Sequence, residues 1–490
     1  MPTPFRHLVV LMLENRSFDH MLGFLQSPEY PIEGLTGNEI NPSAAEGGLP
    51  VVVSRDAHSV HDLNPDPGHD FIDVNVQIFG NKDGIPGGPT MQGFVQDYAL
   101  VSNHVEQGAN VMKCFTADTL PVLSTLAQQY AVCDHWYSSV PGPTIPNRLF
   151  AHAASSAGSV TQDAVAAPAV VKTIFEVIDD PENPSSFRIY APGASILMAN
   201  LYLARHQQGF HAYSEFRNDC LKGDLPEYTF IEPSYDDDFA NGVFATSQHP
   251  DFPVNQGEAL ISDVYNALRD GSQWETTLLL IVYDEHGGIF DHVLPPAVVK
   301  NPAFAGLPDP PPSTDPPFAF NRLGVRVPAV FVSPFIKAGT ILSEPFDHCS
   351  IVATVRKLFC LDKTPFNWRE AQAATFENIL NLPVDQMRTD RVVLPAPVVA
   401  DPPADMAAAA GGAFAIATAQ PKIPPAVKKP TDLAVSMARA MEYTMSHLGI
   451  KPAMQTSQIY SAQDASSFLS DAAVALSGAG KTAGAGGSRG

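Results

Sequence analysis

Short apolar runs that stop abruptly at polar residues recur along the chain and predict the strands of a buried sheet. They are shorter than a membrane-spanning segment and have the length and composition of buried strands. The runs cover His7–Leu13, Phe187–Ala191, Tyr228–Ile231, Thr277–Tyr283 and 327–332. Apolar residues at helical spacing predict helices over 120–130 and 350–359. This alternation predicts an α/β fold, in which helices cover both faces of a mostly parallel or mixed central sheet.

The pattern changes near residue 394, and we interpret residues 1–394 as one large domain. Residues 395–430 are rich in Pro and Ala and predict an extended arm or linker. An amphipathic helix with its N-cap at Thr431 is predicted for residues 431–449. Its apolar stripe is typical of a docking surface, for which we favour the same domain over a second subunit or a lipid surface. Residues 450–490 end in a stretch rich in Gly, Ala and Ser, and we expect a largely flexible tail there.

The composition is that of a globular protein with a sizeable core, since 45% of the 490 residues are hydrophobic and 17% are charged. The formal net charge of −23 argues against a nucleic-acid partner and against attachment to anionic membranes through a basic patch. A neutral, zwitterionic or small phosphorylated substrate is compatible with this charge. The five cysteines are odd in number and lack zinc-type spacing, which favours buried thiols over a disulfide framework.

The amino-terminal segment does not resemble a secretory signal, because its apolar run, residues 8–13, is short and is followed at once by Glu14. No apolar run in the sequence reaches the length of a transmembrane helix. The expected location is therefore the cytoplasm, or the cell exterior if the sequence shown is already processed.

Oxygen donors directly follow two of the predicted strands. The fourth apolar run ends in Asp284 and Glu285, and the first ends in Glu14 and Asn15. Taken alone, an Asp-Glu pair more often lies in solvent, and Glu14-Asn15 more often caps a helix. Open α/β sheets bind ligands at the carboxyl ends of their strands, so two such ends together favour one divalent metal site. Carboxylate and amide oxygens suit Mg²⁺, Ca²⁺ or Mn²⁺ better than Zn²⁺, although nearby histidines leave the identity of the ion open.

Thr144 immediately precedes a predicted helix, in which Pro146 suits the first turn and Gly158 suits the end. Asn147 lies one turn into that helix. A helix amino terminus offers free backbone N–H groups and a positive dipole, which together bind anions. Thr144 either only caps the helix or is a nucleophile, which a divalent cation would activate by lowering the pKa of its hydroxyl.

Two histidines could complete a phosphate pocket. His69 lies in a turn rich in Pro and Gly, and His249 lies in the sequence Gln-His-Pro-Asp. A histidine in a loop is more often only exposed. Together with Asn147 and the helix amino terminus, however, these side chains could bind the non-bridging oxygens of a phosphoryl group, and a histidine could protonate the leaving alcohol. These parts predict a phosphoester hydrolase that passes through a phosphothreonine intermediate.

Six longer motifs stand in this order along the chain: ENRSFDHMLGF, NPDPGHDF, GPTIPNRLFAHAASSAG, YDEHGGIFDHV, RLGVRVPAVFVSPFI and FDHCSIVATV. Together they resemble the motifs of the bacterial phosphoesterase family. That family includes phosphatidylcholine-hydrolysing phospholipases C and a group of acid phosphatases. The resemblance covers about residues 5–375, and within the family the chain is most similar to the plant non-specific phospholipases C.

The resemblance implies an alkaline-phosphatase-like α/β core, and it implies that residues 1–394 are a phosphoesterase catalytic domain. It places the nucleophile at Thr144, where the acid phosphatases carry serine. The metal ligands that it implies are Glu14, Asn15, Asp284 and Glu285. The phosphate-pocket residues that it implies are His69, Asn147 and His249. Three further histidines match family motifs, and we interpret them as supporting or structural residues: His286, His292 and His348.

The chain departs from the family pattern near His249. Related sequences often carry a second histidine shortly after this position, whereas Phe252 stands in that region here. The group that protonates the leaving alcohol is therefore open. Arg148, in the third motif, is either the ion-pair partner of an acid or a substrate contact.

The function that we expect first is that of a phospholipase C, which hydrolyses a glycerophospholipid such as phosphatidylcholine to diacylglycerol and a phosphorylated head group. The alternative is a broad-specificity acid phosphatase that acts on small phosphomonoesters. Both enzymes would use the same residues. The threonine at position 144 is the feature that resembles the phospholipases C of the family. A catalytically silent binding protein on the same fold is a third reading, but it would lack the nucleophile or an acid ligand, and neither is missing. The expected partners are the phospholipid or phosphomonoester and a transient lipid surface, with no nucleic acid.

Overall fold

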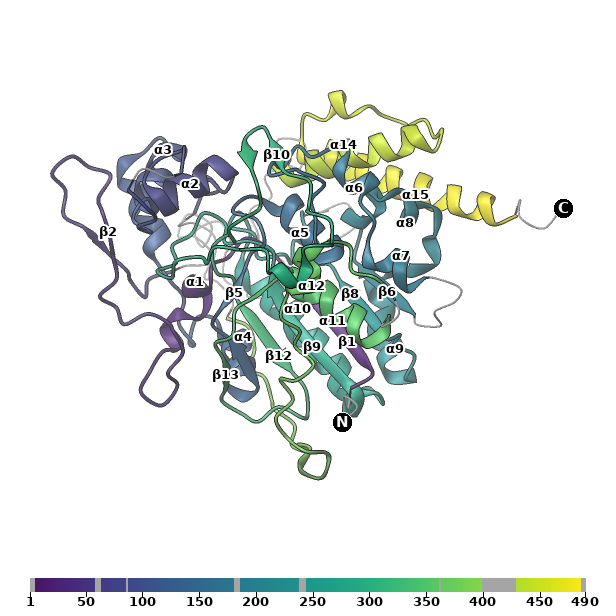
Figure 1. The fold of residues 1–490 in the computed structure, drawn as a ribbon, viewed down its shortest axis with the longest axis horizontal. Helices are drawn as coiled ribbons and strands as arrows, with labels where there is room; N and C mark the ends of the chain where they lie inside the picture. The colour runs from purple at the N-terminus through teal and green to yellow at the C-terminus, as the bar shows by residue number, and fades with distance from the viewer. Residues whose placement is uncertain are drawn as a thin grey trace, which may run out of the picture.

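A mixed sheet, eight-stranded in the described part of the chain, forms the centre of the structure, which is a computed structural model (Figure 1). The structure describes residues 5–57, 63–84, 87–179, 186–237, 244–360, 363–398 and 429–485. From one edge of the sheet to the other, the strands are Thr340–Leu342 (β13), Ala131–Cys133 (β4), Ala329–Val332 (β12), Thr277–Tyr283 (β9), His7–Leu13 (β1), Tyr228–Ile231 (β8), Phe187–Ala191 (β6) and Phe210–Ala212 (β7). Short two-stranded ribbons pair Ile40–Asn41 (β2) with Val51–Val52 (β3), Ser313–Thr314 (β10) with Pro317–Phe318 (β11), and Trp136–Tyr137 (β5) with Phe346–Asp347 (β14).

The middle of the sheet is parallel. The strands β9, β1, β8, β6 and β7 run in the same direction, whereas β12 is antiparallel to both β9 and β4. Leu13 of β1 lies opposite Tyr283 of β9, so these two strands end at the same level. Four predicted strands are confirmed with their bounds, as is the mixed sheet. The fifth begins at Ala329 and not at residue 327, because Pro328 has no N–H to contribute to a ladder.

Helices cover both faces of the sheet. Residues 8–13 of β1 are 0% exposed and the residues of β9 at most 1%, and a strand buried on both sides must be covered on both sides. One group of contacting helices is Pro121–Gln129 (α4), Tyr213–Lys222 (α9) and Val254–Asp270 (α10). The other is Thr144–Ala153 (α5), Ile174–Ile178 (α7), Cys349–Phe359 (α11) and Trp368–Gln372 (α12). The α/β class and the two predicted helices are therefore confirmed, and the bounds of both helices agree within one residue.

Shorter helices lie in the connections between these elements. The α-helices among them are Phe18–Leu22 (α1), Phe71–Phe79 (α2), Phe94–Val101 (α3), Ala167–Val170 (α6) and Leu201–Arg205 (α8). The 3₁₀ turns are Gly23–Leu25 (η1), Val105–Met112 (η2), Ile196–Ala199 (η3), Gln207–Gly209 (η4), Trp274–Thr276 (η5), Pro302–Phe304 (η6), Val384–Gln386 (η7) and Thr456–Gln458 (η9). All five cysteines are buried free thiols, as predicted.

The predicted amphipathic helix is present as Asp432–His447 (α14), and the Thr431 hydroxyl caps it by accepting the N–H of Ala434 at 3.2 Å. Its apolar stripe packs on the same chain, against α6, η3 and α8. Figure 1 shows α14 lying beside α6 and α8. The Thr444 hydroxyl also donates to the carbonyl of Ala199 in η3. The buried residues of the stripe are Leu433, Met437, Met441 and Met445.

The segment 450–490 differs from the expected flexible tail, because Ala462–Ala485 (α15) is a helix. Alanine is the best helix former, and the apolar residues of α15 up to position 476 recur every three or four positions on the side that meets α14 and α8. Those buried residues are Ala465, Phe468, Ala472 and Leu476. The predicted arm, 395–430, lies outside the described residues over 399–428. No described helix combines the length and the apolarity needed to span a bilayer.

The amino terminus of α4 is capped by a side chain that comes from more than a hundred residues away. Pro121 has no N–H, and the next two amides, those of Val122 and Leu123, donate to the Glu258 carboxylate of α10 at 2.6 and 2.8 Å. Helix amino termini leave such amides without partners inside the helix. Glu258 therefore joins two helices that cover the sheet.

Replacing Glu258 should destabilise the fold. Glu258→Ala leaves both amides buried without an acceptor, and we expect the free energy of unfolding to fall by about 2 kcal/mol. Glu258→Gln keeps one acceptor oxygen and should lose about half as much. Urea denaturation at one pH measures both variants, and an unchanged midpoint for Glu258→Ala would contradict the capping role.

Stability should also depend on pH through the same carboxyl. Burial raises the pKa of Glu258 to about 7, from an ordinary value of 4.5. A raised pKa in the folded state stabilises below the unfolded value, and this contribution is lost as pH rises through the folded value. The stability of the wild type relative to Glu258→Gln, which cannot titrate, should therefore decrease between about pH 5 and pH 8. Urea denaturation of both proteins across that range tests the sign.

Candidate active site

The oxygen donors that follow β1 and β9 lie together, as the sequence predicts. Because the two strands are parallel neighbours in register, Glu14 and Asp284 leave the sheet side by side. The N–H of Asn15 donates to Asp284 Oδ1 at 3.1 Å, which ties the two strand ends to each other. The four predicted metal ligands, Glu14, Asn15, Asp284 and Glu285, are at most 1% exposed.

Two glycines allow these segments to approach closely. Gly287 and Gly288 follow Glu285 with φ values of +66° and +67°, a region that side chains disfavour. A Cβ on Gly287 would lie 2.2 Å from the carbonyl oxygen of Asn15, and one on Gly288 would lie 2.2 Å from that of Gly68. The glycine pair therefore lets the end of β9 contact both Asn15 and the loop that carries His69.

Thr144 is the first residue of α5 and is 1% exposed. Its hydroxyl donates to Asn15 Oδ1 at 3.3 Å, so the predicted nucleophile contacts a predicted metal ligand directly. The predicted end of this helix at Gly158 is wrong, because α5 stops at Ala153 and Ala154 turns to φ +50°. The Ala154 carbonyl accepts a hydrogen bond from the side chain of Asn367 at 2.9 Å, a tertiary contact that local sequence does not reveal.

The side chain of Asn147, for which the sequence predicts a phosphate contact, bonds to the loop before Thr144. Its Oδ1 accepts the N–H of Val140 at 2.9 Å, and its Nδ2 donates to the carbonyls of Val140, Gly142 and Pro143 at 2.9–3.1 Å. The side-chain amide is thus committed to the loop that leads into Thr144. Asn147 therefore shapes the loop that leads into Thr144.

Arg148 is an ion-pair partner, one of the two alternatives that the sequence left open. It is 2% exposed, and its Nε donates to Asp284 Oδ2 at 3.0 Å. Its Nη2 also donates to the carbonyl of Leu13 at 3.1 Å. One side chain of α5 thus holds the ends of both central strands. Asp284 Oδ1 accepts the N–H of Glu285 at 2.7 Å in addition to that of Asn15, so the carboxylate is held on both oxygens.

The remaining acid oxygens are suited to a divalent cation. Both carboxylate oxygens of Glu14 and Oε1 of Glu285 are buried without a hydrogen-bond partner. Burial, followed by the negative charge of Asp284, raises the pKa of Glu14 well above its usual value, and burial does the same for Glu285. Buried carboxylates are costly unless a positive charge compensates them. Hard oxygen donors in this number are compatible with one divalent ion.

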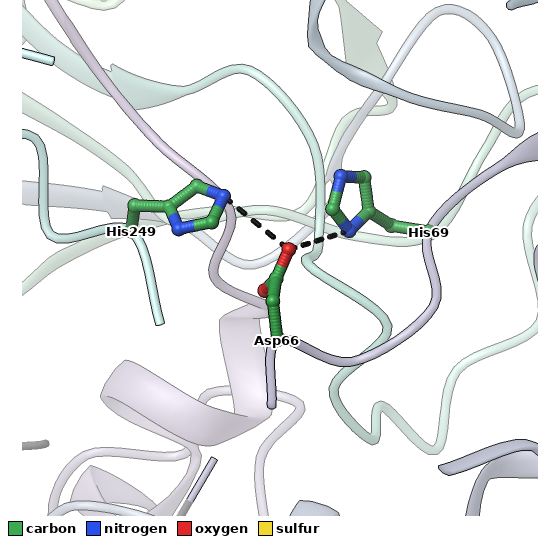
Figure 2. Close-up of side chains that lie close together, drawn as sticks. All are labelled: Asp66, His69 and His249. Atoms are coloured by element: carbon green, nitrogen blue, oxygen red, sulfur yellow. Dashed lines mark ion pairs between the residues drawn. The ribbon is translucent and has the colours of Figure 1, made fainter. Parts of the chain in front are cut away.

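His69 and His249 meet at a carboxylate that the sequence analysis did not single out. Asp66 Oδ2 lies 3.5 Å from His69 Nδ1 and 3.5 Å from His249 Nε2, as Figure 2 shows. The two rings are 6.1 Å apart and nearly perpendicular. The sequence signal that could have identified Asp66 is its position three residues before His69 in the same turn.

Such groups of His and acidic side chains occur at three places among the described residues, with potential ligand atoms within 4.8 Å of one another. The Asp66 group is one of them, and the strand-end acids are not. The other two are Asp19 with Asp291 and His292, and His211 with Glu215 and Asp219.

Two of the three supporting histidines contact the site. His348 lies 2.6 Å from the carbonyl of Asp284 through Nε2, while Trp136 donates to its Nδ1 at 3.2 Å. This donor fixes the tautomer in which His348 Nε2–H donates to Asp284. His286 Nε2 pairs with Gln77 Oε1 at 2.7 Å, and burial together with His69 lowers the pKa of His286 to about 3.

His292 belongs to a separate buried network. Its Nδ1 lies 2.6 Å from Asp19 Oδ2, and Arg326 joins Asp19 to Asp291 with contacts of 2.9 Å each.

Phe252 stands where related sequences often carry a histidine. It is buried, and its N–H donates to the carbonyl of His249 at 2.8 Å.

Comparison with known proteins agrees with the motifs. The model of the Phosphoesterase family matches residues 5–362. Non-specific phospholipase C6 of Arabidopsis thaliana is 40% identical over 396 residues, which are 77% of this chain and 72% of the relative. Phospholipase C B of Mycobacterium tuberculosis is 26% identical over 442 residues, which are 77% of this chain and 78% of the relative.

Similarity to solved structures is weaker. A lipoteichoic acid synthase from Listeria monocytogenes aligns with a TM-score of 0.35 and 10% identity over 77% of this chain and 76% of that chain. The family model, by contrast, covers most of the chain and includes every residue of the candidate site. The chain therefore belongs to the Phosphoesterase family, as its ordered motifs predicted, and is a phosphoric ester hydrolase.

Proposed function

We propose that this protein is a phospholipase C-type phosphoesterase, which hydrolyses glycerophospholipids to diacylglycerol and a phosphorylated head group. The observation that supports this most directly is the Thr144 hydroxyl, held 3.3 Å from Asn15 Oδ1 beside buried acids that lack partners. Relatives that are 40% identical carry the name non-specific phospholipase C. The net charge of −23 favours a substrate with a zwitterionic head group over one with several negative charges.

The proposed nucleophile is the Thr144 hydroxyl. A divalent cation held by Glu14, Asn15, Asp284 and Glu285 would lower the pKa of that hydroxyl and neutralise phosphoryl charge. Thr144 Oγ1 loses its proton to water and attacks phosphorus, the bond from phosphorus to the glycerol oxygen breaks, and the alcohol leaves with a proton from a histidine. Water then hydrolyses the phosphothreonine and releases the phosphorylated head group.

The surrounding residues position the reacting groups. Asn147 fixes the loop before Thr144, and Arg148 fixes Asp284, so the nucleophile and the metal ligands share one rigid frame. The positive end of α5 faces the place where negative charge develops. One of its first amides, that of Ile145, donates to Gln162 Oε1 at 3.1 Å. His69 and His249 are the side chains that we assign to the phosphoryl oxygens and to the leaving group.

Removing the nucleophile tests this proposal. Thr144→Ala should lower kcat by about a thousandfold or more, because no second hydroxyl takes its place in the mechanism. Thr144→Ser keeps the hydroxyl and should retain measurable activity. The assay follows diacylglycerol and phosphocholine released from phosphatidylcholine vesicles and, in parallel, p-nitrophenol released from p-nitrophenyl phosphate.

The outcomes separate the alternatives. Lipid products made by the wild type and lost in Thr144→Ala support a phospholipase C that uses Thr144. Turnover of only the small ester by the wild type would instead indicate an acid phosphatase. Full activity in Thr144→Ala would show that the nucleophile is another group.

Removing the cation gives a second test. Treatment with EDTA should abolish activity, and a divalent ion should restore it, because the buried acids otherwise repel one another and the substrate. Glu285→Gln should bind less metal, measured as metal per protein by mass spectrometry, and should lose activity in proportion. Glu275→Gln, an exposed acid on η5, is the matched control. A metal-free protein with full activity would contradict the assignment.

A further inference from the structure

The proposed mechanism assigns no task to Asp66, although its carboxylate lies between two histidines. We propose that Asp66 is a positioning residue that orients His69 for protonating the leaving alcohol, with His249 holding Asp66 from the opposite side. The proposal rests on the proposed function and deepens it, because it assigns the group that the family pattern leaves open.

Asp66 is held in place by contacts on both sides of it in the chain. The Tyr98 hydroxyl donates to the carbonyl of Pro65 at 2.8 Å, and Gln77 Nε2 donates to that of Gly68 at 2.7 Å. Gly288, next to the predicted metal ligands, packs against the same Gly68 carbonyl. The loop is therefore anchored both to the α2–α3 region and to the end of β9.

His249 approaches from a segment that is anchored independently. Arg16 Nε donates to the carbonyl of Gln248 at 2.7 Å, and the N–H of Glu14 donates to the carbonyl of Ser247 at 2.9 Å. This fixes His249 relative to the end of β1. Its Nε2 faces Asp66 at 3.5 Å and its Nδ1 faces Asp251 at 3.9 Å. Asp66 thus joins two segments that are more than 180 residues apart in the sequence.

The geometry around His69 selects which of its nitrogens can meet the substrate. His69 Nδ1 lies 2.9 Å from the carbonyl of Pro67, an acceptor, so Nδ1 carries a proton. The same nitrogen lies 3.5 Å from Asp66 Oδ2, which is an ion-pair distance for the protonated ring. With Nδ1 committed to the loop, Nε2 is the nitrogen that can donate a proton to the glycerol oxygen as its bond to phosphorus breaks.

A metal ion bound by Asp66, His69 and His249 is the competing interpretation. A histidine binds a metal through a lone pair, whereas the contact with the Pro67 carbonyl requires a proton on the nitrogen that faces Asp66. The observed geometry therefore favours a carboxylate that orients a histidine. Figure 2 shows the carboxylate between the two rings.

The test compares two phosphocholine esters whose leaving groups differ in their need for an acid. p-Nitrophenylphosphocholine releases a stable phenolate, whereas short-chain phosphatidylcholine releases an alcohol that must be protonated. Asp66→Asn should lower kcat on the lipid by about a hundredfold and on the nitrophenyl ester by less than about tenfold. Asp70→Asn, in the same turn, removes a charge and keeps an N-cap residue for α2, so the ratio of the two activities should stay near that of the wild type.

A double variant tests whether Asp66 acts through His69. If it does, His69→Gln and the pair Asp66→Asn with His69→Gln should have the same activity on the lipid, because the second change removes nothing further. Multiplied losses would overturn the proposal, and so would equal losses on both substrates by Asp66→Asn. Loss of one metal equivalent from Asp66→Asn, measured by mass spectrometry, would overturn it in favour of a metal site.

Failure of the proposed function is recognised separately, in the wild type. If the wild type cleaves p-nitrophenyl phosphate but no lipid, the proposed function fails. The role of Asp66 is then tested with p-nitrophenyl phosphate and an alkyl phosphate monoester. Asp66→Asn should again lose more activity on the alkyl ester than on the nitrophenyl ester. Thermal melting of each variant shows whether a loss of activity comes from unfolding.

Discussion

A buried ion pair between α5 and the end of β9 organises the site. Arg148 bonds to Asp284 and to the carbonyl of Leu13, so it joins the helix that begins with Thr144 to the two strands that supply the predicted metal ligands. Removing one partner of a buried pair leaves the other charge uncompensated, which typically costs about 3–5 kcal/mol. The distance between Thr144 and the predicted metal ligands is therefore set by the core of the protein.

The same region carries a negative charge that the protein alone does not neutralise. Arg148 bonds to Asp284 and lies 4.0 Å from Glu14 Oε1, but both oxygens of Glu14 and one of Glu285 are buried without a hydrogen-bond partner. Proteins tolerate such groups where function requires them and compensate for the cost elsewhere. Here the compensation is the surrounding sheet, whose central strands are apolar and completely buried. The site is thus a local departure from good packing inside a well-packed frame.

Sequence was informative where local pattern decides the structure. The strands next to Glu14 and Asp284 were predicted correctly because an apolar run that ends in acids is a local signal, and parallel pairing then brings the acids together. The sequence was uninformative where a contact between distant segments decides the structure. Asp66 lies beside His249, more than 180 residues away in the sequence, and the amide of Asn147 bonds to a loop whose course no periodicity reveals. Helix α15 was missed because its Ala-rich composition also suits a flexible tail, and only packing on α14 distinguishes the two.

The carboxyl-terminal helices also constrain the order in which the chain can fold. The apolar surface of η3 and α8 is covered by α14 and α15, and Met198 shares one cluster with Met441 and Phe468, more than 240 residues later. Contacts between such distant segments form late, because a long loop must close before they are gained. During synthesis, the apolar surface of η3 and α8 therefore stays uncovered until residues 432–485 have left the ribosome. Helices α14 and α15 then complete the core on this side of the molecule.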